Sequence, residues 1–249
     1  MKIGASTLAG IEFDLEKSLE FIESLGIDYA EIVHQYPTAQ IDQEILESYN
    51  LKYSIHAPFM DVNIASLQDQ IRLSSIKEIE ASIDLANEID AKAVVVHPGL
   101  ISFLPRKYFK KEVYEFANNS IKEIGDYAKD LGVMATIENM PNFDTMIYQD
   151  IHALNELLEE YEMYMTLDIG HANHAGYSAD EIIFDSIKHV HAHDNFGDDD
   201  SHLPLGEGNI ELNDIINSLE SKNYKGIYIL EVNDFDSIEK SYEYMEKNF

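Results

Sequence analysis

The sequence predicts an α/β protein folded as a single (β/α)₈ barrel, also called a TIM barrel. Short apolar, β-branched runs alternate along the whole chain with longer segments of helical period, which indicates βα units around a parallel sheet. The chain has 249 residues, the usual size of such a barrel. No Pro-, Gly- or Ser-rich linker interrupts the alternation, so residues 1–249 are predicted to form one domain.

Eight strands are predicted from the apolar runs, at residues 2–7, 29–34, 52–57, 93–98, 134–139, 163–169, 187–193 and 226–232. Eight helices are expected between and after them, most clearly at residues 67–89 and 109–131, where apolar side chains recur close to every 3.6 positions. A doubly wound open sheet is the alternative arrangement. It is disfavoured because the first strand is not followed by G-x-G-x-x-G and no G-K-[ST] loop is present.

Composition excludes several classes of function. The chain has 17 Lys and Arg against 47 Asp and Glu, a formal net charge of −30, which repels nucleic acid and anionic lipid. It has no cysteine, so disulfides, thiolate metal sites and thiol nucleophiles are excluded, and a reducing compartment fits. No apolar run has the length of a signal core or membrane span, so we expect a cytoplasmic protein with no membrane partner.

Ionisable side chains gather where the predicted strands end, and these ends surround one mouth of a barrel. One such residue alone is more often a hydrogen-bonded partner than a ligand. Burying many of them is costly unless a cation pairs with them. His, Asp and Glu without thiolate suit Zn²⁺ or Mn²⁺ first, with Fe²⁺, Co²⁺ and Mg²⁺ also compatible. The nine candidates are His56, His97, Glu138, Asp168, His171, His191, Asp200, His202 and Glu231.

The motifs that carry these residues occur in the order H-A-P, H-P-G, I-E-N, L-D-I-G-H, H-x-H-D-N, D-x-H-x-x-L-G-E-G and a final L-E. With this set the chain resembles the xylose isomerase-like TIM-barrel superfamily over nearly its whole length. That superfamily contains sugar isomerases and epimerases and also endonuclease IV, an AP endonuclease of family 2. The resemblance implies a divalent-metal site with one to three ions.

Similarity to the ketose epimerases implies a single metal ion and a pair of catalytic carboxylates. The metal ligands would be Glu138, Asp168, His191 and Glu231. Glu138 and Glu231 would also move the proton on opposite faces of the substrate, while the cation stabilises the enediolate oxygens. His171 and His56 would contact substrate hydroxyls.

Similarity to endonuclease IV instead implies that all nine positions bind a zinc cluster, which would activate water for phosphodiester cleavage. The chain departs from that family at basic positions. Ser201 stands where the family has an arginine, and Asn195-Phe196 stands where it has Ser-Lys. His193 replaces the expected asparagine, and three consecutive aspartates end at Asp200, which would repel a duplex.

We therefore predict a metal-dependent sugar or sugar-phosphate isomerase or epimerase, with a multi-zinc phosphodiesterase as the alternative. Arg106 is a candidate for binding a substrate phosphate, against the simpler interpretation of a surface cation. A non-catalytic barrel that binds a metabolite is a second alternative. The expected partner is a small sugar or sugar phosphate and not nucleic acid, and a homodimer is compatible with the sequence.

Overall fold

The computed structural model describes residues 1–12 and 14–249, and their strands form one closed barrel. All neighbouring strands are parallel, and β1 pairs with β8 to close the ring. The predicted barrel is therefore confirmed, and each predicted strand contains one of the observed strands: β1 Ile3–Ser6, β2 Tyr29–Val33, β3 Lys52–His56, β4 Val94–Val96, β5 Ala135–Glu138, β6 Tyr164–Asp168, β7 Ile187–Ala192 and β8 Tyr228–Leu230.

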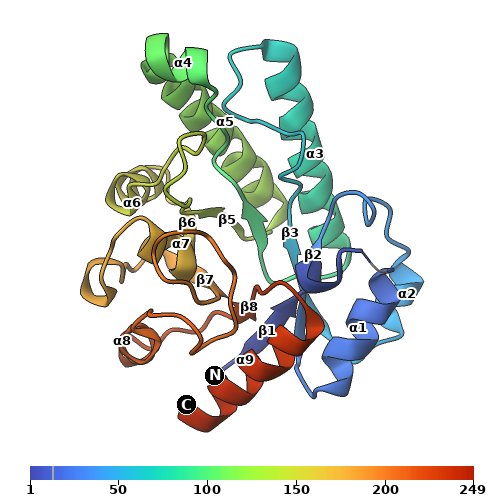
Figure 1. Ribbon diagram of the computed structural model, residues 1–249. Coiled ribbons are helices and arrows are strands. Elements are labelled where there is room, and N and C mark those ends of the chain that lie inside the picture. The colour runs from blue at the N-terminus through green and yellow to red at the C-terminus, as the bar shows by residue number, and fades with distance from the viewer. Residues whose placement is uncertain (13) are drawn as a thin grey trace.

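Helices surround the strands (Figure 1). The described residues contain nine α-helices, one more than the eight expected: α1 Leu15–Ser24, α2 Gln43–Glu47, α3 Asp69–Glu88, α4 Phe103–Tyr108, α5 Lys110–Leu131, α6 Ile151–Glu160, α7 Ile169–His174, α8 Leu212–Ser221 and α9 Phe235–Asn248. The extra helix is α4. It is separated from α5 because Phe109, with φ −137° and ψ 29°, leaves helical geometry between them. None of the described helices is long and apolar enough to cross a membrane.

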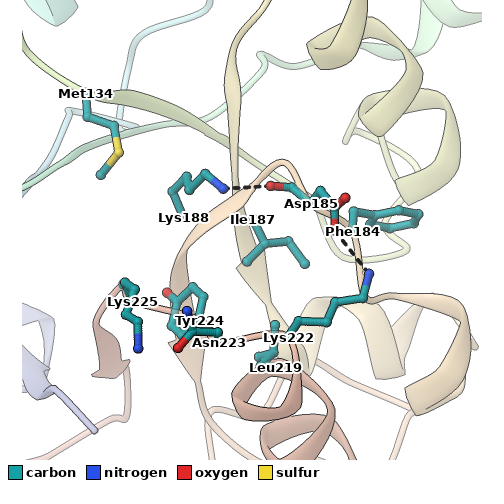
Figure 2. A pocket seen from close by; sticks show the side chains of 11 residues that line it. Met134, Phe184, Asp185, Ile187, Lys188, Leu219, Lys222, Asn223, Tyr224 and Lys225 are labelled. Carbon is teal, nitrogen blue, oxygen red and sulfur yellow. Dashed lines mark hydrogen bonds and ion pairs between the residues drawn. The ribbon is translucent and has the colours of Figure 1, made fainter.

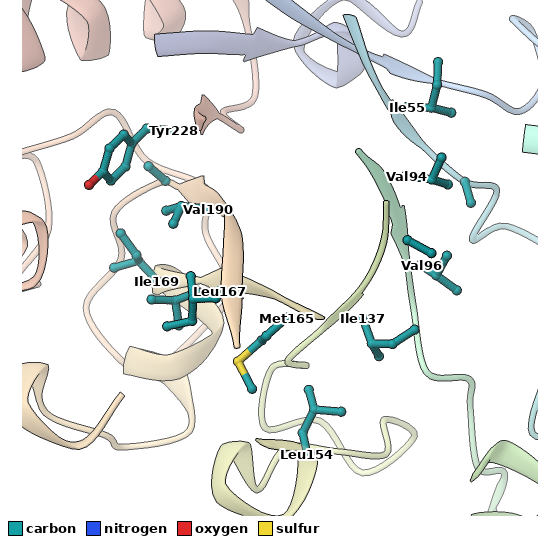
Figure 3. Packing of buried hydrophobic residues seen from close by; sticks show 14 of the residues in the cluster. Ile55, Val94, Val96, Ile137, Leu154, Met165, Leu167, Ile169, Val190 and Tyr228 are labelled. Atoms are coloured by element: carbon teal, nitrogen blue, oxygen red, sulfur yellow. The ribbon is translucent and has the colours of Figure 1, made fainter. Parts of the chain in front are cut away.

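Alternation along each strand divides the core from the site. Successive side chains of a strand point to opposite faces. Ile137, Leu167 and Val190 belong to the apolar cluster that packs under the helices, as Figure 3 shows. Their sequence neighbours Glu138, Asp168 and His191 must then face the barrel axis. This period of two explains how strongly polar side chains occur within otherwise apolar strands.

The barrel interior below these residues is also polar. The Thr136 and Thr166 hydroxyls are 2.6 Å apart, and Ser54 Oγ donates to Glu31 Oε2 at 2.9 Å. All four side chains are buried. Buried polar groups of this kind are tolerated only when paired. The carboxyl ends of the strands are therefore supported in part by a hydrogen-bonded layer.

Candidate metal centre

The structure brings all nine predicted ligands together at the carboxyl end of the barrel. His56, Glu138 and Asp168 are the last residues of β3, β5 and β6, and Glu231 directly follows β8. The ligand atoms fall into adjoining groups whose members lie within 4.8 Å of one another. The groups that contain the nine are His56, His97 and Glu138; then Glu138, Asp168, His191 and Glu231; then His171, His193, Asp200 and His202.

In the central group, formed by Glu138, Asp168, His191 and Glu231, the three carboxylates surround His191 Nδ1. His191 Nδ1 lies 3.2 Å from Glu138 Oε1, 3.1 Å from Glu231 Oε2 and 3.9 Å from Asp168 Oδ2. All four side chains are at most 5% exposed. Three carboxylates at these distances in a buried site repel one another unless a cation lies between them.

Asp168 is fixed in place by the turn that follows its strand. Its carboxylate caps α7 by accepting a hydrogen bond from the His171 backbone N–H at 2.6 Å. The Asn139 side chain holds the Asp168 backbone on both sides, accepting from its N–H at 2.8 Å and donating to its carbonyl at 3.0 Å. The L-D-I-G-H motif thus places a carboxylate and an imidazole side by side at the end of β6.

The loop that carries Asp200 and His202 is closed on itself. Asp194 and Leu203 form an antiparallel bridge with backbone hydrogen bonds of 2.9 and 2.8 Å. The buried Asp194 carboxylate accepts from the backbone N–H groups of Gly206 and Ile210 at 3.0 and 3.2 Å. This bracing keeps Asp200 and His202 against the strand ends, although they come from a loop.

Hydrogen bonds fix which ring nitrogen each histidine presents. Nδ1 of His56, His171 and His202 lies 2.7–2.8 Å from the main-chain carbonyls of Ala57, Asn139 and Glu231. A carbonyl only accepts, so Nδ1 carries the hydrogen and Nε2 presents a lone pair when the ring is neutral. Those three Nε2 atoms face carboxylate oxygens of Glu138 or Asp200 at 3.2–3.5 Å.

A lone pair that faces a carboxylate is repulsive without a cation between the two. This is the arrangement of metal-binding histidines, whose other nitrogen donates to an outer acceptor. Buried oxygens of Glu138, Asp168 and Asp200 also have no hydrogen-bond partner among the described residues. The donor set of imidazole and carboxylate fits a divalent metal.

The pKa values of the histidines and carboxylates at this site also show that it favours positive charge. Burial lowers the pKa of His171, but Asp168 and Asp200 outweigh it and raise the pKa to about 10. Burial raises the pKa of Glu231, but His191 outweighs it and lowers the pKa to about 2. Glu138 keeps a pKa well below its usual range because His191 and His97 oppose its burial. In the absence of a metal, protons on imidazoles supply the missing charge.

Sequence reasoning missed Glu31, which lies in the middle of β2 and is fully buried. Its Oε2 accepts from Ser54 and lies 2.7 Å from His189 Nε2, and its Oε1 lies 2.8 Å from His191 Nε2. A carboxylate beside Nε2 keeps the hydrogen on that nitrogen and leaves Nδ1 as the ligand atom. The signal was available, because His189 and His191 are two residues apart and so face the same side of the strand.

Arg106 is the one predicted site residue that the structure places outside these groups. It lies on α4, where its guanidinium forms an ion pair with the carboxylate of Asp144 and donates to the Asp144 carbonyl at 3.0 Å. Its role in binding a substrate phosphate stays a prediction.

A separate cavity of about 640 Å³ lies toward the amino end of the barrel (Figure 2). It is lined by residues that include Lys188, Lys222 and Lys225. Lys188 Nζ donates to the Asp185 carbonyl at 2.7 Å, and Lys222 Nζ lies 3.2 Å from the Asp185 carboxylate. This cavity contains none of the nine predicted ligands.

Comparison with known proteins places the chain in a family. The family model described as "Xylose isomerase-like TIM barrel" matches residues 19–248. The chain belongs to this family. An uncharacterized protein of Methanocaldococcus jannaschii is 34% identical over 261 residues, covering 99% of this chain and 89% of that protein.

Solved structures with the same fold include sugar epimerases. A D-tagatose 3-epimerase-like protein superposes with a TM-score of 0.91 at 34% identity, over 100% of this chain and 97% of the other. D-allulose 3-epimerase from Methylomonas sp., solved in complex with D-allulose, superposes with a TM-score of 0.80 at 18% identity, over 100% and 97% of the two chains. The second likeness is one of fold alone.

Proposed function

We propose that this protein is a divalent-metal-dependent epimerase or isomerase of a small sugar or sugar phosphate. The observation that carries the proposal is the central group, in which Glu138 and Glu231 both lie within 3.2 Å of His191 Nδ1, with Asp168 beside them. Two buried carboxylates around one cation site supply a base, an acid and a charge acceptor in one place. The likeness to a D-tagatose 3-epimerase-like protein over the whole chain supports the same reaction class.

An epimerase inverts the configuration of a carbon next to a carbonyl, and an isomerase shifts the carbonyl to the neighbouring carbon. One of Glu138 and Glu231, as carboxylate, accepts the proton of the carbon beside the carbonyl, and the bonding pair passes into an enediolate. The other, in its acid form, returns a proton to the opposite face, so the product is an epimer and no electrons leave the substrate. A metal held by Glu138, Asp168, His191 and Glu231 would supply Lewis-acid stabilisation of the enediolate oxygens.

The test replaces each carboxylate by its amide in metal-reconstituted protein. Glu138→Gln and Glu231→Gln keep a coordinating oxygen but cannot exchange a proton, so we expect kcat on a panel of D-tagatose, D-allulose, D-fructose and L-ribulose to fall at least about 100-fold. Sugar affinity should change much less. A non-catalytic binding barrel would show no turnover in the wild type, and retained kcat in both variants would refute the proposed roles.

A multi-metal phosphoesterase is the second candidate, and one observation favours it. Glu138 Oε2 lies 3.5 Å from His56 Nε2 and 3.0 Å from His97 Nε2, so this carboxylate could bridge the central group and the His56–His97 pair. A bridging Glu138 would not be free to carry a proton. The acidic run at residues 198–200 opposes a DNA substrate.

The His97→Ala variant separates the two candidates. The epimerase predicts that metal content per chain and sugar turnover are little changed, because His97 is outside the central group. The phosphoesterase predicts the loss of about one ion and of hydrolysis of bis(p-nitrophenyl) phosphate. The same wild-type sample should be assayed on the ketose panel and on this diester.

A further inference from the structure

His193 is a fully buried histidine that the proposed sugar chemistry does not use. It directly follows β7 and alternates with His189 and His191, so it continues the inward-facing side of that strand. Its ring lies over Gly170 of α7, where a Cβ would overlap the imidazole. The chain thus keeps a glycine at the position where this ring needs room.

Neither ring nitrogen of His193 makes a hydrogen bond among the described residues, although Nε2 lies 3.1 Å from the buried Asp168 Oδ1. Three histidines of the metal centre differ from it, because His56, His171 and His202 each bond a main-chain carbonyl through Nδ1. A buried imidazole with both nitrogens unpaired costs free energy, since water satisfies them in the unfolded chain. A metal ion would satisfy one of them.

The unpaired ring is directed at a specific group of atoms. His193 Nε2 lies 3.6 Å from Asp200 Oδ1, and its ring stacks on His202 with a centroid distance of 3.9 Å. Ligand atoms of His171, His193, Asp200 and His202 all lie within 4.8 Å of one another. His171 and His202 present Nε2 to Asp200 Oδ2 at 3.2 and 3.3 Å.

We propose that His193 completes a second, closed metal site with His171, Asp200 and His202. Three imidazoles and one carboxylate give four protein ligands, which is the full coordination of Zn²⁺ in structural sites. The resemblance to endonuclease IV implies only three of these ligands, with an asparagine in place of His193. The fourth ligand leaves no open position for water or substrate, so the ion at this site is structural.

The function of such an ion follows from where its ligands come from. His171 is on α7, His193 follows β7, and Asp200 and His202 are in the loop after β7. One ion would tie this loop to the strand ends beside the central group. The inference does not require the proposed epimerase activity, because it concerns ion binding and loop stability.

The test uses Co²⁺ as a spectroscopic probe on full-length, chelator-stripped protein. Four-coordinate Co²⁺ absorbs visible light far more strongly than five- or six-coordinate Co²⁺. We expect His193→Asn to weaken binding of one Co²⁺ per chain at least about 10-fold and to remove its intense visible bands. His174→Asn, a change in α7 at a histidine outside every candidate group, is the matched control and should keep both.

Unchanged Co²⁺ stoichiometry, affinity and spectrum in His193→Asn would overturn the inference. His193→Gln, which fills more of the space left by the ring, is the second variant if His193→Asn does not fold by circular dichroism. Failure of the proposed function has a different signature, because it appears as unchanged kcat in Glu138→Gln and Glu231→Gln and leaves the Co²⁺ spectra of the His193 variants as they are.

Discussion

Replacing Glu31 tests whether metal affinity depends on a carboxylate that acts through His191 and is not itself a predicted ligand. Burial raises the pKa of Glu31, but His191 and His189 outweigh it and keep that pKa well below its usual range, so Glu31 is a carboxylate at neutral pH. Its Oε2 is bonded to Ser54 and His189, and its Oε1 lies 2.8 Å from His191 Nε2. The Glu31→Gln variant keeps the shape and removes one acceptor oxygen.

The magnitude follows from the donor count. The glutamine oxygen can serve only one of the two imidazoles, and the amide N–H₂ then faces the other. Losing one hydrogen bond to a charged group costs about 1.5–3 kcal/mol. Without this bond the His191 ring can rotate, so that its Nδ1 no longer points at the central group. Changes in such outer partners weaken metal binding about 10- to 100-fold.

The assay is competition for Zn²⁺ and Mn²⁺ between the protein and a chromophoric chelator at fixed pH. Ser54→Ala is the control, because it removes a donor to Glu31 at 2.9 Å but leaves His191 facing the carboxylate. We expect a much smaller loss of affinity in this control. A Glu31→Gln variant that binds metal as tightly as the wild type would refute the claim that Glu31 fixes the ligand nitrogen of His191.

Three further predictions concern stability. Gly170→Ala should destabilise the protein by about 1–3 kcal/mol, because the new Cβ would overlap the His193 ring. In a double-mutant cycle followed by thermal unfolding, adding His193→Ala should recover most of that loss. Additive effects of the two substitutions would contradict the overlap. Chelator should lower the Tm by about 5–11 °C for each ion removed from protein held at about 100-fold Kd of metal, and the shift should be smaller in Asp168→Asn, which lacks a ligand of the central group; an equal shift in the variant would be the contrary result. Hydrogen bonds from Ser237 lower the pKa of Asp234, which caps α9, so the stabilisation of the fold by this carboxylate is present at neutral pH and is lost as pH falls through the folded-state pKa. Asp234→Ala should therefore lower the free energy of unfolding by about 1 kcal/mol at pH 7 and by little near pH 2. A cost in urea unfolding that does not change with pH would exclude the charged cap.

The ligand groups could be predicted from the sequence because the carboxyl ends of all strands in a parallel barrel lie at the same end of the barrel. His56, Glu138 and Asp168 end their strands, so closure of the barrel alone brings them to one mouth. The clearest predicted helices, 67–89 and 109–131, are also close to the observed α3 and α5, because their apolar period is long and regular. Patterns local in sequence therefore accounted for most of the architecture.

The spacing of His189 and His191 was a signal that one face of β7 is polar, but the partners of Glu31 could not be assigned from local pattern. Its partners Ser54 and His189 lie 23 and 158 positions away in sequence, so only the closed barrel brings them together. The extra helix α4 was missed for a different reason. Its separation from α5 depends on the backbone angles of one residue, Phe109, which composition does not indicate.

Solvent deuterium incorporation distinguishes proton abstraction beside a carbonyl from phosphodiester hydrolysis. Metal-reconstituted protein is incubated in D₂O with each of the four ketoses, and the sugars are followed by NMR. We expect deuterium to appear at the carbon beside the carbonyl together with the epimer, chelator to abolish both, and Glu138→Gln and Glu231→Gln each nearly to abolish epimer formation. Metal-loaded wild-type protein that leaves every sugar unlabelled while hydrolysing bis(p-nitrophenyl) phosphate would contradict the epimerase and favour the phosphoesterase.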